Sequence, residues 1–503
     1  AVYPGDKNNL PYDVVVERLH IEEPEPPAPV TEPEKTFEEV LDEHPVSIQV
    51  NGQWETFPNA KAAEEASYEE YKANLRRNAK NFRITDEHLG EGGPKAKFQA
   101  NVNAIRLLKE LEAAGQQASP EQQEVLSRYV GWGGLSDAFD PEKPAWALEY
   151  AQLKELLTPE EYAAARSSTL NAHYTNPTVI QAIYEAVDRM GFETGNILEP
   201  SMGVGNFFGM LPEEMRNSRL YGVELDPVSG RIAKQLYPKA DITVGGFETT
   251  DRRDFFDLAI GNVPFGQYQV RDKAYDKLNF SIHNYFFAKA LDQVRPGGVV
   301  AFVTSRYTMD AKDSTVRRYL AQRAELLGAI RLPNDAFKKN AGAEVVSDII
   351  FLQKRDRPLD IVPEWTQTGQ TEDGFAINRY FIDHPEMVLG RQEPVSTAHG
   401  MDYTVNPIEG LELSDQLHDA VKYIHGTYQE AELPELGEGE AIDTSIPADP
   451  NVKNYSYAIV DGQVYYRENS RMVRPDLNAT AEARVKGLVG LRDCVQELID
   501  LQM

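Results

Sequence analysis

The sequence predicts an α/β fold built on a mostly parallel sheet, and three observations lead to this prediction. Across residues 166–357, short apolar runs alternate with amphipathic segments, which is typical of strands joined by helical crossovers. A glycine-containing turn follows the first of these runs, as in doubly wound sheets. The content of 41% hydrophobic and 26% charged residues is ordinary for a globular protein and excludes a disordered or fibrous one.

Seven apolar runs mark the expected strands in order along the chain. They lie at 197–198, 220–223, 242–244, 258–260, 299–303, 327–330 and 345–352. The amphipathic segments between them are expected to form helices that cover both faces of the sheet.

Composition divides the chain into four expected regions. They are an extended arm with a Pro/Glu linker at 1–36, a hairpin plus helical accessory region at 37–165, the α/β domain at 166–357, and a smaller acidic α+β region at 358–503. The stretch 22–35 holds five prolines and five acidic residues, and such a composition cannot bury a core.

Two turn signals, Asn51-Gly52 and Asp461-Gly462, predict hairpins outside the sheet domain. The remaining expectations come from periodicity and composition: helices within 61–128, breaks at 90–98 and 129–135, an acidic linker near 431–450 and a helix at 480–501. Trp132 and Phe337 are expected to pack in the interior.

The charge is unevenly distributed. The chain has 51 Lys and Arg against 80 Asp and Glu, a net charge of −29, yet residues 166–357 hold 25 basic and 23 acidic residues. The window 71–109 has nine basic residues against three acidic ones. Such a window is either a solvated helix face or a nucleic-acid contact. The second interpretation is open because a near-neutral domain beside a basic segment can hold a polyanion.

Several features limit the class of protein. The single cysteine, Cys494, excludes a disulfide framework and a Cys-based zinc site and fits a reducing cytoplasm. The nine histidines show no metal-like spacing, so no metal is expected. No apolar run is long enough to span a membrane. No signal peptide is visible, and the start at Ala1 indicates a processed or excised piece of a longer chain.

The first candidate binding motif is Ile-Leu-Glu-Pro-Ser-Met-Gly-Val-Gly-Asn-Phe-Phe-Gly, residues 197–209. An apolar strand ends in Glu199, and Gly203 and Gly205 then let the backbone turn tightly and approach a ligand. The acid-Pro start and the missing third glycine distinguish the motif from the G-x-G-x-x-G dinucleotide fingerprint. The alternative is a purely structural turn.

Glu224 ends the next apolar run, within the segment Leu-Tyr-Gly-Val-Glu-Leu-Asp-Pro. An acidic residue at the end of the second strand suits hydrogen bonds to ribose hydroxyls. Together with the first motif, it favours an adenosine-containing cofactor over a surface carboxylate.

The third motif, Gly-Asn-Val-Pro-Phe-Gly at 261–266, follows the fourth apolar run. The side-chain oxygen of Asn262 and a neighbouring backbone carbonyl can accept both hydrogens of an exocyclic amine, and Phe265 can stack a flipped base. Taken alone, Asn and Pro also favour a plain turn.

With these motifs in this order, the domain resembles the N6-adenine amino-methyltransferases, in their gamma-type arrangement. The resemblance covers about 165–357 and includes His-Tyr-Thr-Asn-Pro at 173–177. It implies a Rossmann-like methyltransferase fold, S-adenosylmethionine as the cofactor and methyl transfer to adenine N6. The cofactor contacts that it implies are Tyr174, Thr175, Glu199, Pro200, Ser201, Gly203, Gly205, Asn206, Glu224, Leu225 and Phe247, and the catalytic residues are Asn262, Val263, Pro264 and Phe265.

Three positions depart from the family pattern. Val263 replaces a proline, Asn176 replaces another, and Gly246 stands where the family often has an Asp that holds the cofactor's adenine amine. These departures leave open a silent module that binds cofactor or DNA. Methylation of RNA or of a protein glutamine is a further alternative.

A narrower resemblance extends to the amino-terminal methylase part of very large proteins of phages and conjugative elements, which also carry a helicase. It rests on segments 81–98 and 129–140 together with the motifs above. It implies double-stranded DNA as a partner and a helicase in the same longer polypeptide, since no phosphate-binding loop motif occurs here. Because 358–503 is acidic, residues 61–165 are expected to contribute to DNA binding, with Arg76 and Arg77 as candidates.

Overall fold

A computed structural model describes most of the chain. The described residues are 45–50, 53–63, 66, 80–86, 89–169, 175–337, 345–397, 400–429, 445–447, 449, 452, 455–460, 462–468, 471–475, 477 and 479–501. The chain forms two units, residues 1–79 and 80–503, and each is considered by itself.

In the first unit, β1 (Val46–Val50) and β2 (Gln53–Phe57) form an antiparallel pair. Val46 lies opposite Phe57. The Ser47 and Thr56 hydroxyls are 2.8 Å apart across the pair. The strands confirm the expected hairpin, while its turn and the basic residues Arg76 and Arg77 lie outside the described residues.

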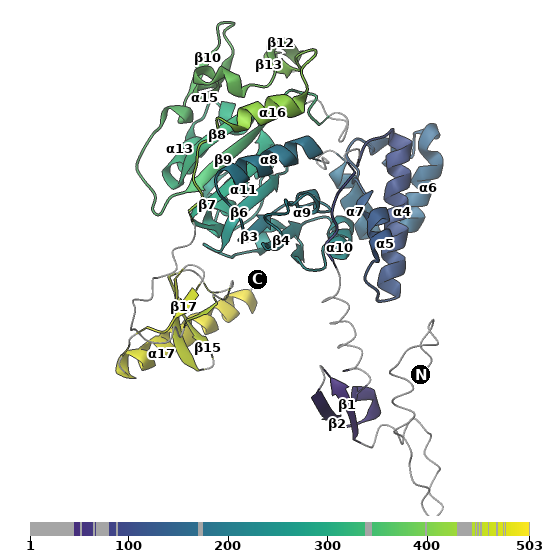
Figure 1. Ribbon diagram of the computed structural model, residues 1–503, viewed down its shortest axis with the longest axis vertical. Coiled ribbons are helices and arrows are strands. Elements are labelled where there is room, and N and C mark those ends of the chain that lie inside the picture. Colours follow the sequence, from purple (N-terminus) through teal and green to yellow (C-terminus); the bar gives the residue numbers. More distant parts are fainter. Residues whose placement is uncertain are drawn as a thin grey trace, which may run out of the picture. The chain divides into compact units, whose positions relative to one another are not determined.

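The second unit contains a seven-stranded sheet in the order β5-β4-β3-β6-β7-β9-β8 (Figure 1). All pairs are parallel except those of β9, which runs antiparallel to both of its neighbours. The strands are β3 (Asn196–Glu199), β4 (Arg219–Glu224), β5 (Asp241–Val244), β6 (Phe256–Asn262), β7 (Val294–Ser305), β8 (Ala324–Arg331) and β9 (Ser347–Lys354). Each contains or overlaps one predicted apolar run, so the predicted α/β fold with a mostly parallel sheet is confirmed.

Helices and short helical turns precede β3 or lie between these strands. They are α8 (Pro177–Arg189), α9 (Asn206–Gly209), α10 (Pro227–Leu236), α11 (Ile282–Gln293), α12 (Tyr307–Asp310) and α13 (Thr315–Arg323). Asn176 starts α8: its side chain accepts a hydrogen bond from the Thr178 N–H at 3.0 Å. Asp226 starts α10 in the same way, through the Ser229 N–H at 2.7 Å. The departure at Asn176 therefore supplies a good helix cap.

The helical region before the sheet comprises α4 (Pro94–Ala113), α5 (Pro120–Ser127), α6 (Ala147–Leu156) and α7 (Pro159–Ser168). The break expected at 90–98 ends sooner than predicted, because Pro94 occupies the first position of α4, where proline is favoured. Trp132 is 1% exposed and contacts the rings of Phe98, Tyr129 and Phe139. Its predicted packing role is confirmed.

The helical region is attached to α10. Arg231 on α10 forms ion pairs with Glu112 at 2.9 Å and with Glu161 at 2.8 Å. Gln123 Nε2 donates to the Leu236 carbonyl at 3.2 Å. One hydrophobic core extends from Phe82 to Ile424 and joins the helical region to the sheet. The four-region division stays a prediction.

Small elements follow the sheet. They are β10 (Thr368–Gln370), β11 (Ala376–Asn378), α15 (Arg379–Asp383), β12 (Arg391–Thr397), β13 (Gly400–Asn406), α16 (Leu413–Val421), β14 (Ile446–Pro447), β15 (Tyr457–Val460), β16 (Gln463–Glu468), β17 (Arg471–Val473) and α17 (Ala479–Leu501). The hairpin β15–β16 and the helix α17 confirm the two carboxyl-terminal predictions. Most of the acidic linker expected near 431–450 lies outside the described residues.

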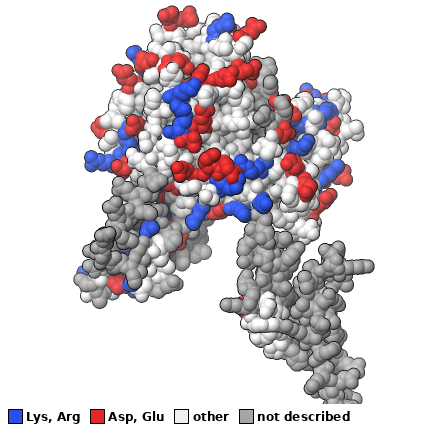
Figure 2. Space-filling view, in the orientation of Figure 1, with Lys and Arg blue, Asp and Glu red and all other residues white. Residues whose placement is uncertain are grey.

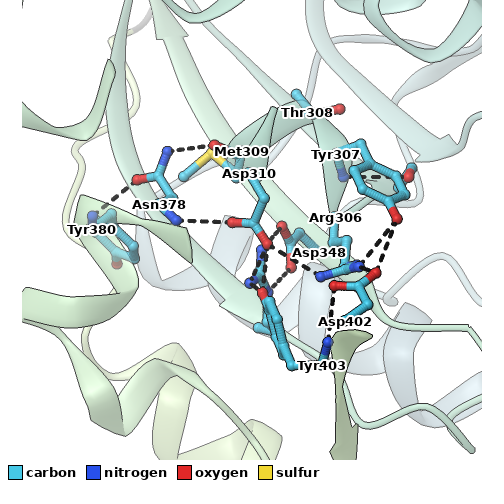
Figure 3. Close-up of polar contacts among 12 residues, drawn as sticks. Arg306, Tyr307, Thr308, Met309, Asp310, Asp348, Asn378, Tyr380, Asp402 and Tyr403 are labelled. Atoms are coloured by element: carbon cyan, nitrogen blue, oxygen red, sulfur yellow. Dashed lines mark hydrogen bonds and ion pairs between the residues drawn. The ribbon is translucent and has the colours of Figure 1, made fainter. Parts of the chain in front are cut away.

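A buried ionic network ties β11 and β13 to the sheet (Figure 3). Arg331, at the end of β8, makes two hydrogen bonds of 2.8 Å to Asp348 on β9 and one of 2.7 Å to Asp310. Asp310 also accepts from the Asn378 N–H of β11 and from the Tyr403 hydroxyl of β13. The network therefore fixes the carboxyl-terminal additions to the same sheet edge as the ends of β7 and β8.

Phe337 is 2% exposed and belongs to the core, as expected.

Among the described helices, none is both long enough and apolar enough to span a membrane.

Candidate functional site

A cavity of about 500 Å³ opens at the carboxyl ends of β3, β4, β5 and β6. Ligands bind at this edge in open α/β sheets. The predicted site residues that line it are Thr175, Glu199, Pro200, Ser201, Gly203, Asn206, Glu224, Leu225, Phe247, Asn262, Val263 and Pro264. The tertiary structure thus brings three separate sequence motifs together around one cavity.

Two predicted residues, Gly205 and Phe265, do not line the cavity, and a third is not described. Gly205 precedes α9 with a φ of 86°, and a Cβ there would lie 2.5 Å from the Tyr237 ring. It permits close packing and does not line the cavity. Phe265 is partly buried against the hydrophobic core and is not among the lining residues. Tyr174 lies outside the described residues.

Glu224 organises the glycine turn. Its Oε2 accepts a hydrogen bond from the Gly203 N–H at 2.7 Å, and its Oε1 accepts one from the Asp226 N–H at 2.7 Å. Gly203 has a φ of 55°, which a side chain would disfavour. Burial raises the pKa of Glu224 to about 7, although the N–H of Asp226 lowers it. The first and second motifs are therefore directly bonded to one another.

Glu199 is 2% exposed, and its Oε2 has no hydrogen-bond partner within the part of the chain that is described. Burial, followed by the nearby charge of Glu224, raises its pKa well above the ordinary value. A buried carboxyl oxygen without a partner is costly. At the wall of a cavity it suits a ligand with a cationic amino group, and the residues present therefore fit the predicted cofactor.

Asn262 is held at the end of β6. Its Nδ2 donates to Thr175 Oγ1 at 3.2 Å, and its carbonyl accepts from Ser201 Oγ at 2.9 Å. The neighbouring Val263 N–H donates to the Val303 carbonyl at 3.1 Å. With the amide in this orientation, Thr175 Oγ1 accepts from Nδ2, and Oδ1 keeps the role of acceptor. The valine departure is compatible with this geometry, since Val263 is 1% exposed and well packed.

Glu248 is a lining residue that sequence reasoning missed. The space that a side chain at Gly246 would occupy is filled by the Glu248 carboxylate. A carboxylate therefore lies at this place although position 246 itself is a glycine. The acidic residue after Gly-Gly-Phe was the available sequence signal.

Two further walls of the cavity were also missed. Tyr129 and Gly131, with Ser167 and Ser168, come from the helical region. The segment between β6 and α11 contributes Tyr268 and others. Tyr129 is 1% exposed, and burial, with the charge of Asp226, raises its pKa well above the ordinary value. The helical region, which was expected to contribute to DNA binding, therefore also lines the cavity.

In the described ranges, no group of three or more His, Cys, Asp and Glu side chains is arranged to hold a metal ion.

Comparison with known proteins finds relatives over parts of the chain. No family model matches. The chain is 28% identical over 272 residues to the defense against restriction protein B of Escherichia phage P1, covering 53% of this chain and 10% of that protein. It is 45% identical over 74 residues to the type II methyltransferase M.CvrRI of Paramecium bursaria Chlorella virus XZ-6E, covering 15% of this chain and 19% of the enzyme. The chain spans only a small part of the length of either relative.

Among solved structures, a candidate class I S-adenosylmethionine-dependent methyltransferase from Listeria monocytogenes is 18% identical. It covers 54% of this chain and 90% of its own, with a TM-score of 0.34. A structure from a type I restriction–modification system is 17% identical, covers 59% of this chain and 67% of its own, and has a TM-score of 0.32.

Proposed function

We propose that this chain is an S-adenosylmethionine-dependent DNA methyltransferase that methylates the N6 amino group of an adenine extruded from the duplex. The observation that carries the proposal is Asn262, whose amide nitrogen is engaged by Thr175 while Oδ1 is left to accept at the edge of the cavity. The names of the two sequence relatives, a methyltransferase and a protein that defends against restriction, support modification of DNA.

The cofactor is held by the first two motifs. Glu199 accepts from the amino group of the methionine part, and Glu224 accepts from the ribose hydroxyls beside the Gly203 turn. Phe247 packs on the adenine ring, and the Glu248 carboxylate accepts from the adenine amine. When bound, S-adenosylmethionine supplies an electrophilic methyl group.

The third motif acts on the acceptor base. Asn262 Oδ1 and the Val263 carbonyl accept hydrogen bonds from the adenine amino group, which concentrates electron density on N6 and orients its lone pair. As the nitrogen becomes positively charged, its N–H groups become more acidic and these bonds strengthen. Asn262 therefore stabilises the transition state more than the ground state. No base of high pKa is needed, since the proton leaves after attack.

Substitution of Asn262 tests the proposal. Asn262→Ala is expected to abolish transfer of a radiolabelled methyl group to adenine-rich duplex DNA, with cofactor affinity changed less than threefold. Asn217→Ala, at an exposed position outside the cavity, is the matched control and should retain activity. Adenine-methylation mapping of the product identifies the base and its sequence context.

The other readings are outcomes of the same experiment. Binding of cofactor and DNA by the wild-type chain without labelling identifies a silent module. Labelling of RNA or of a protein glutamine in place of DNA identifies a different acceptor. Unchanged turnover in Asn262→Ala overturns the proposed mechanism.

A further inference from the structure

Tyr268, in the segment between β6 and α11, is an exposed aromatic side chain at the rim of the cavity. It lines the cavity and is 48% exposed, whereas Phe265 is partly buried against the core. An exposed ring beside a ligand cavity presents a flat apolar face to whatever enters. Such a face suits a planar aromatic ligand.

The position of the Tyr268 ring depends on Gly266. A Cβ at Gly266 would lie 2.5 Å from Cε1 and 2.7 Å from Cδ1 of the Tyr268 ring. Gly266 does not have a positive φ. A glycine is therefore needed here because the Tyr268 ring lies so close to the backbone, and not because of the backbone angle. The ring thus lies directly across the end of the Asn-Val-Pro-Phe-Gly motif.

The segment that carries Tyr268 is anchored at Tyr268 itself and at Asp272. The Tyr268 carbonyl accepts from the Ile282 N–H at 2.8 Å, at the start of α11. Asp272, four residues later, accepts from Lys289 Nζ and from the Tyr285 hydroxyl, each at 2.8 Å. Lys289 is 3% exposed and also donates to the Glu248 carbonyl at 3.1 Å. The segment that carries Tyr268 is therefore braced against the cofactor side of the cavity.

We propose that Tyr268, and not Phe265, provides the aromatic face on which the acceptor base stacks. This inference rests on the proposed function, because it assumes that an extruded adenine enters the cavity beside Asn262. Stacking on an aromatic side chain contributes substantially to the binding of an unpaired base. Tyr268 would hold the base in the plane in which Asn262 Oδ1 can reach its amino group.

The experiment uses the full chain and a duplex that contains a site mapped from wild-type methylation. Tyr268→Ala is expected to raise the KM for this duplex about tenfold. Affinity for S-adenosylmethionine, measured by calorimetry, should be unchanged. Tyr268→Phe, which keeps the ring, should recover most of the loss. Tyr423→Ala, at a site that is 50% exposed and outside the cavity, is the matched control.

Gly266→Ala gives an independent test, since its Cβ displaces the ring and leaves Tyr268 in the sequence. Gly266→Ala should raise the KM for the duplex as Tyr268→Ala does. The KM of the Gly266→Ala/Tyr268→Ala double variant should be no higher than that of either single variant. With 2-aminopurine at the mapped position, wild type should hold the base in a quenched stacked state that Tyr268→Ala loses.

The outcomes separate the two proposals. If wild type methylates no DNA, the proposed function fails and the inference fails with it. If wild type methylates adenine but Tyr268→Ala leaves KM and 2-aminopurine fluorescence unchanged, only the inference is overturned. It is also overturned if Tyr268→Ala weakens cofactor binding alone, or if Phe265→Leu raises KM tenfold while Tyr268→Ala does not.

Discussion

The acidic side chains around the cavity differ in their partners within the protein. Glu224 accepts from two backbone N–H groups, whereas Glu199 Oε2 has no partner among the described residues. Glu248 is exposed at the rim. Glu224 is thus engaged by the turn, whereas Glu199 Oε2 is not engaged within the described part of the chain.

Loss of Glu248 should affect recognition of the cofactor's adenine. Glu248→Ala removes the carboxylate that fills the space above Gly246, and a hydrogen bond to a charged group contributes about 1.5–3 kcal/mol. Cofactor Kd should rise at least about tenfold in calorimetry, with kcat little changed. An analogue with hypoxanthine in place of adenine has an acceptor oxygen at this position, so it should bind the variant at least as well as wild type.

Glu325→Ala, at the opposite edge of the sheet, is the control for general effects of removing a carboxylate. A Glu248→Ala variant that still discriminates against the hypoxanthine analogue as wild type does would contradict the assignment.

Cofactor affinity should depend on pH through Glu224. Burial raises its pKa to about 7, so the folded protein without ligand holds this group protonated below that pH. The carboxylate is the better acceptor for ribose hydroxyls, and Kd should therefore fall as pH rises from about 6 to about 8. Calorimetry on Glu224→Gln, which cannot ionise, should show a flatter dependence over the same range.

The raised pKa of Glu224 makes the folding stability decrease as pH rises, whereas cofactor affinity increases. The unfolded chain loses this proton near the ordinary value of about 4.3, below the folded value. The contribution of Glu224 to stability is therefore present at low pH and is lost as pH rises through about 7. A Kd that is independent of pH in wild type would contradict this account.

At the scale of elements, the ends of β7, β8 and β9 are joined by buried charges. Arg331 and Asp348 are fully buried. Burial alone would lower the pKa of Arg331, but the Asp310 and Asp348 carboxylates raise it well above its ordinary value. The guanidinium therefore stays charged and compensates two carboxylates that would be costly alone.

Arg331→Met should destabilise the fold strongly. It leaves Asp310 and Asp348 buried without their cation, which costs about 3–5 kcal/mol of unfolding free energy, measured by urea denaturation. Arg379→Met removes an exposed pair with Asp383 and should cost less than about 1 kcal/mol. Equal losses in the two variants would show that the buried network adds nothing beyond a surface pair.

At the scale of the whole molecule, charges of both signs are interspersed on the face that Figure 2 shows. A net charge of −29 opposes non-specific association with DNA. On the proposed function, contact with DNA would therefore come from local basic groups, and the window 71–109 is the candidate from sequence.

Charge reversal at Arg76 and Arg77 should lower DNA affinity and flatten its dependence on salt, because fewer phosphate counterions are released. Fluorescence anisotropy across a salt series measures both quantities. Arg379→Glu, an exposed reversal in the carboxyl-terminal region, is the control. The same slope in wild type and in the double reversal would remove this window from the DNA contact.

The sequence alone was sufficient to predict the strands of the sheet and the residues at the centre of the cavity. Apolar runs specify buried parallel strands, and the carboxyl ends of parallel strands meet at one edge. Glu199, Glu224 and Asn262, each at a strand end, were therefore expected to meet, and all three line the cavity. The roles of these residues stay predictions.

Only the tertiary structure decided which other side chains complete the cavity, because those choices depend on contacts between distant segments. Thr175 accepts a hydrogen bond from Asn262, 87 positions away in the chain. Tyr129, which also lines the cavity, belongs to the helical region that precedes the sheet. The motif marked Phe265 as the aromatic for a flipped base; the structure shows Phe265 partly buried against the core and Tyr268 exposed at the rim. A motif determines which residues stand at a strand end, whereas packing determines which of their neighbours face the ligand.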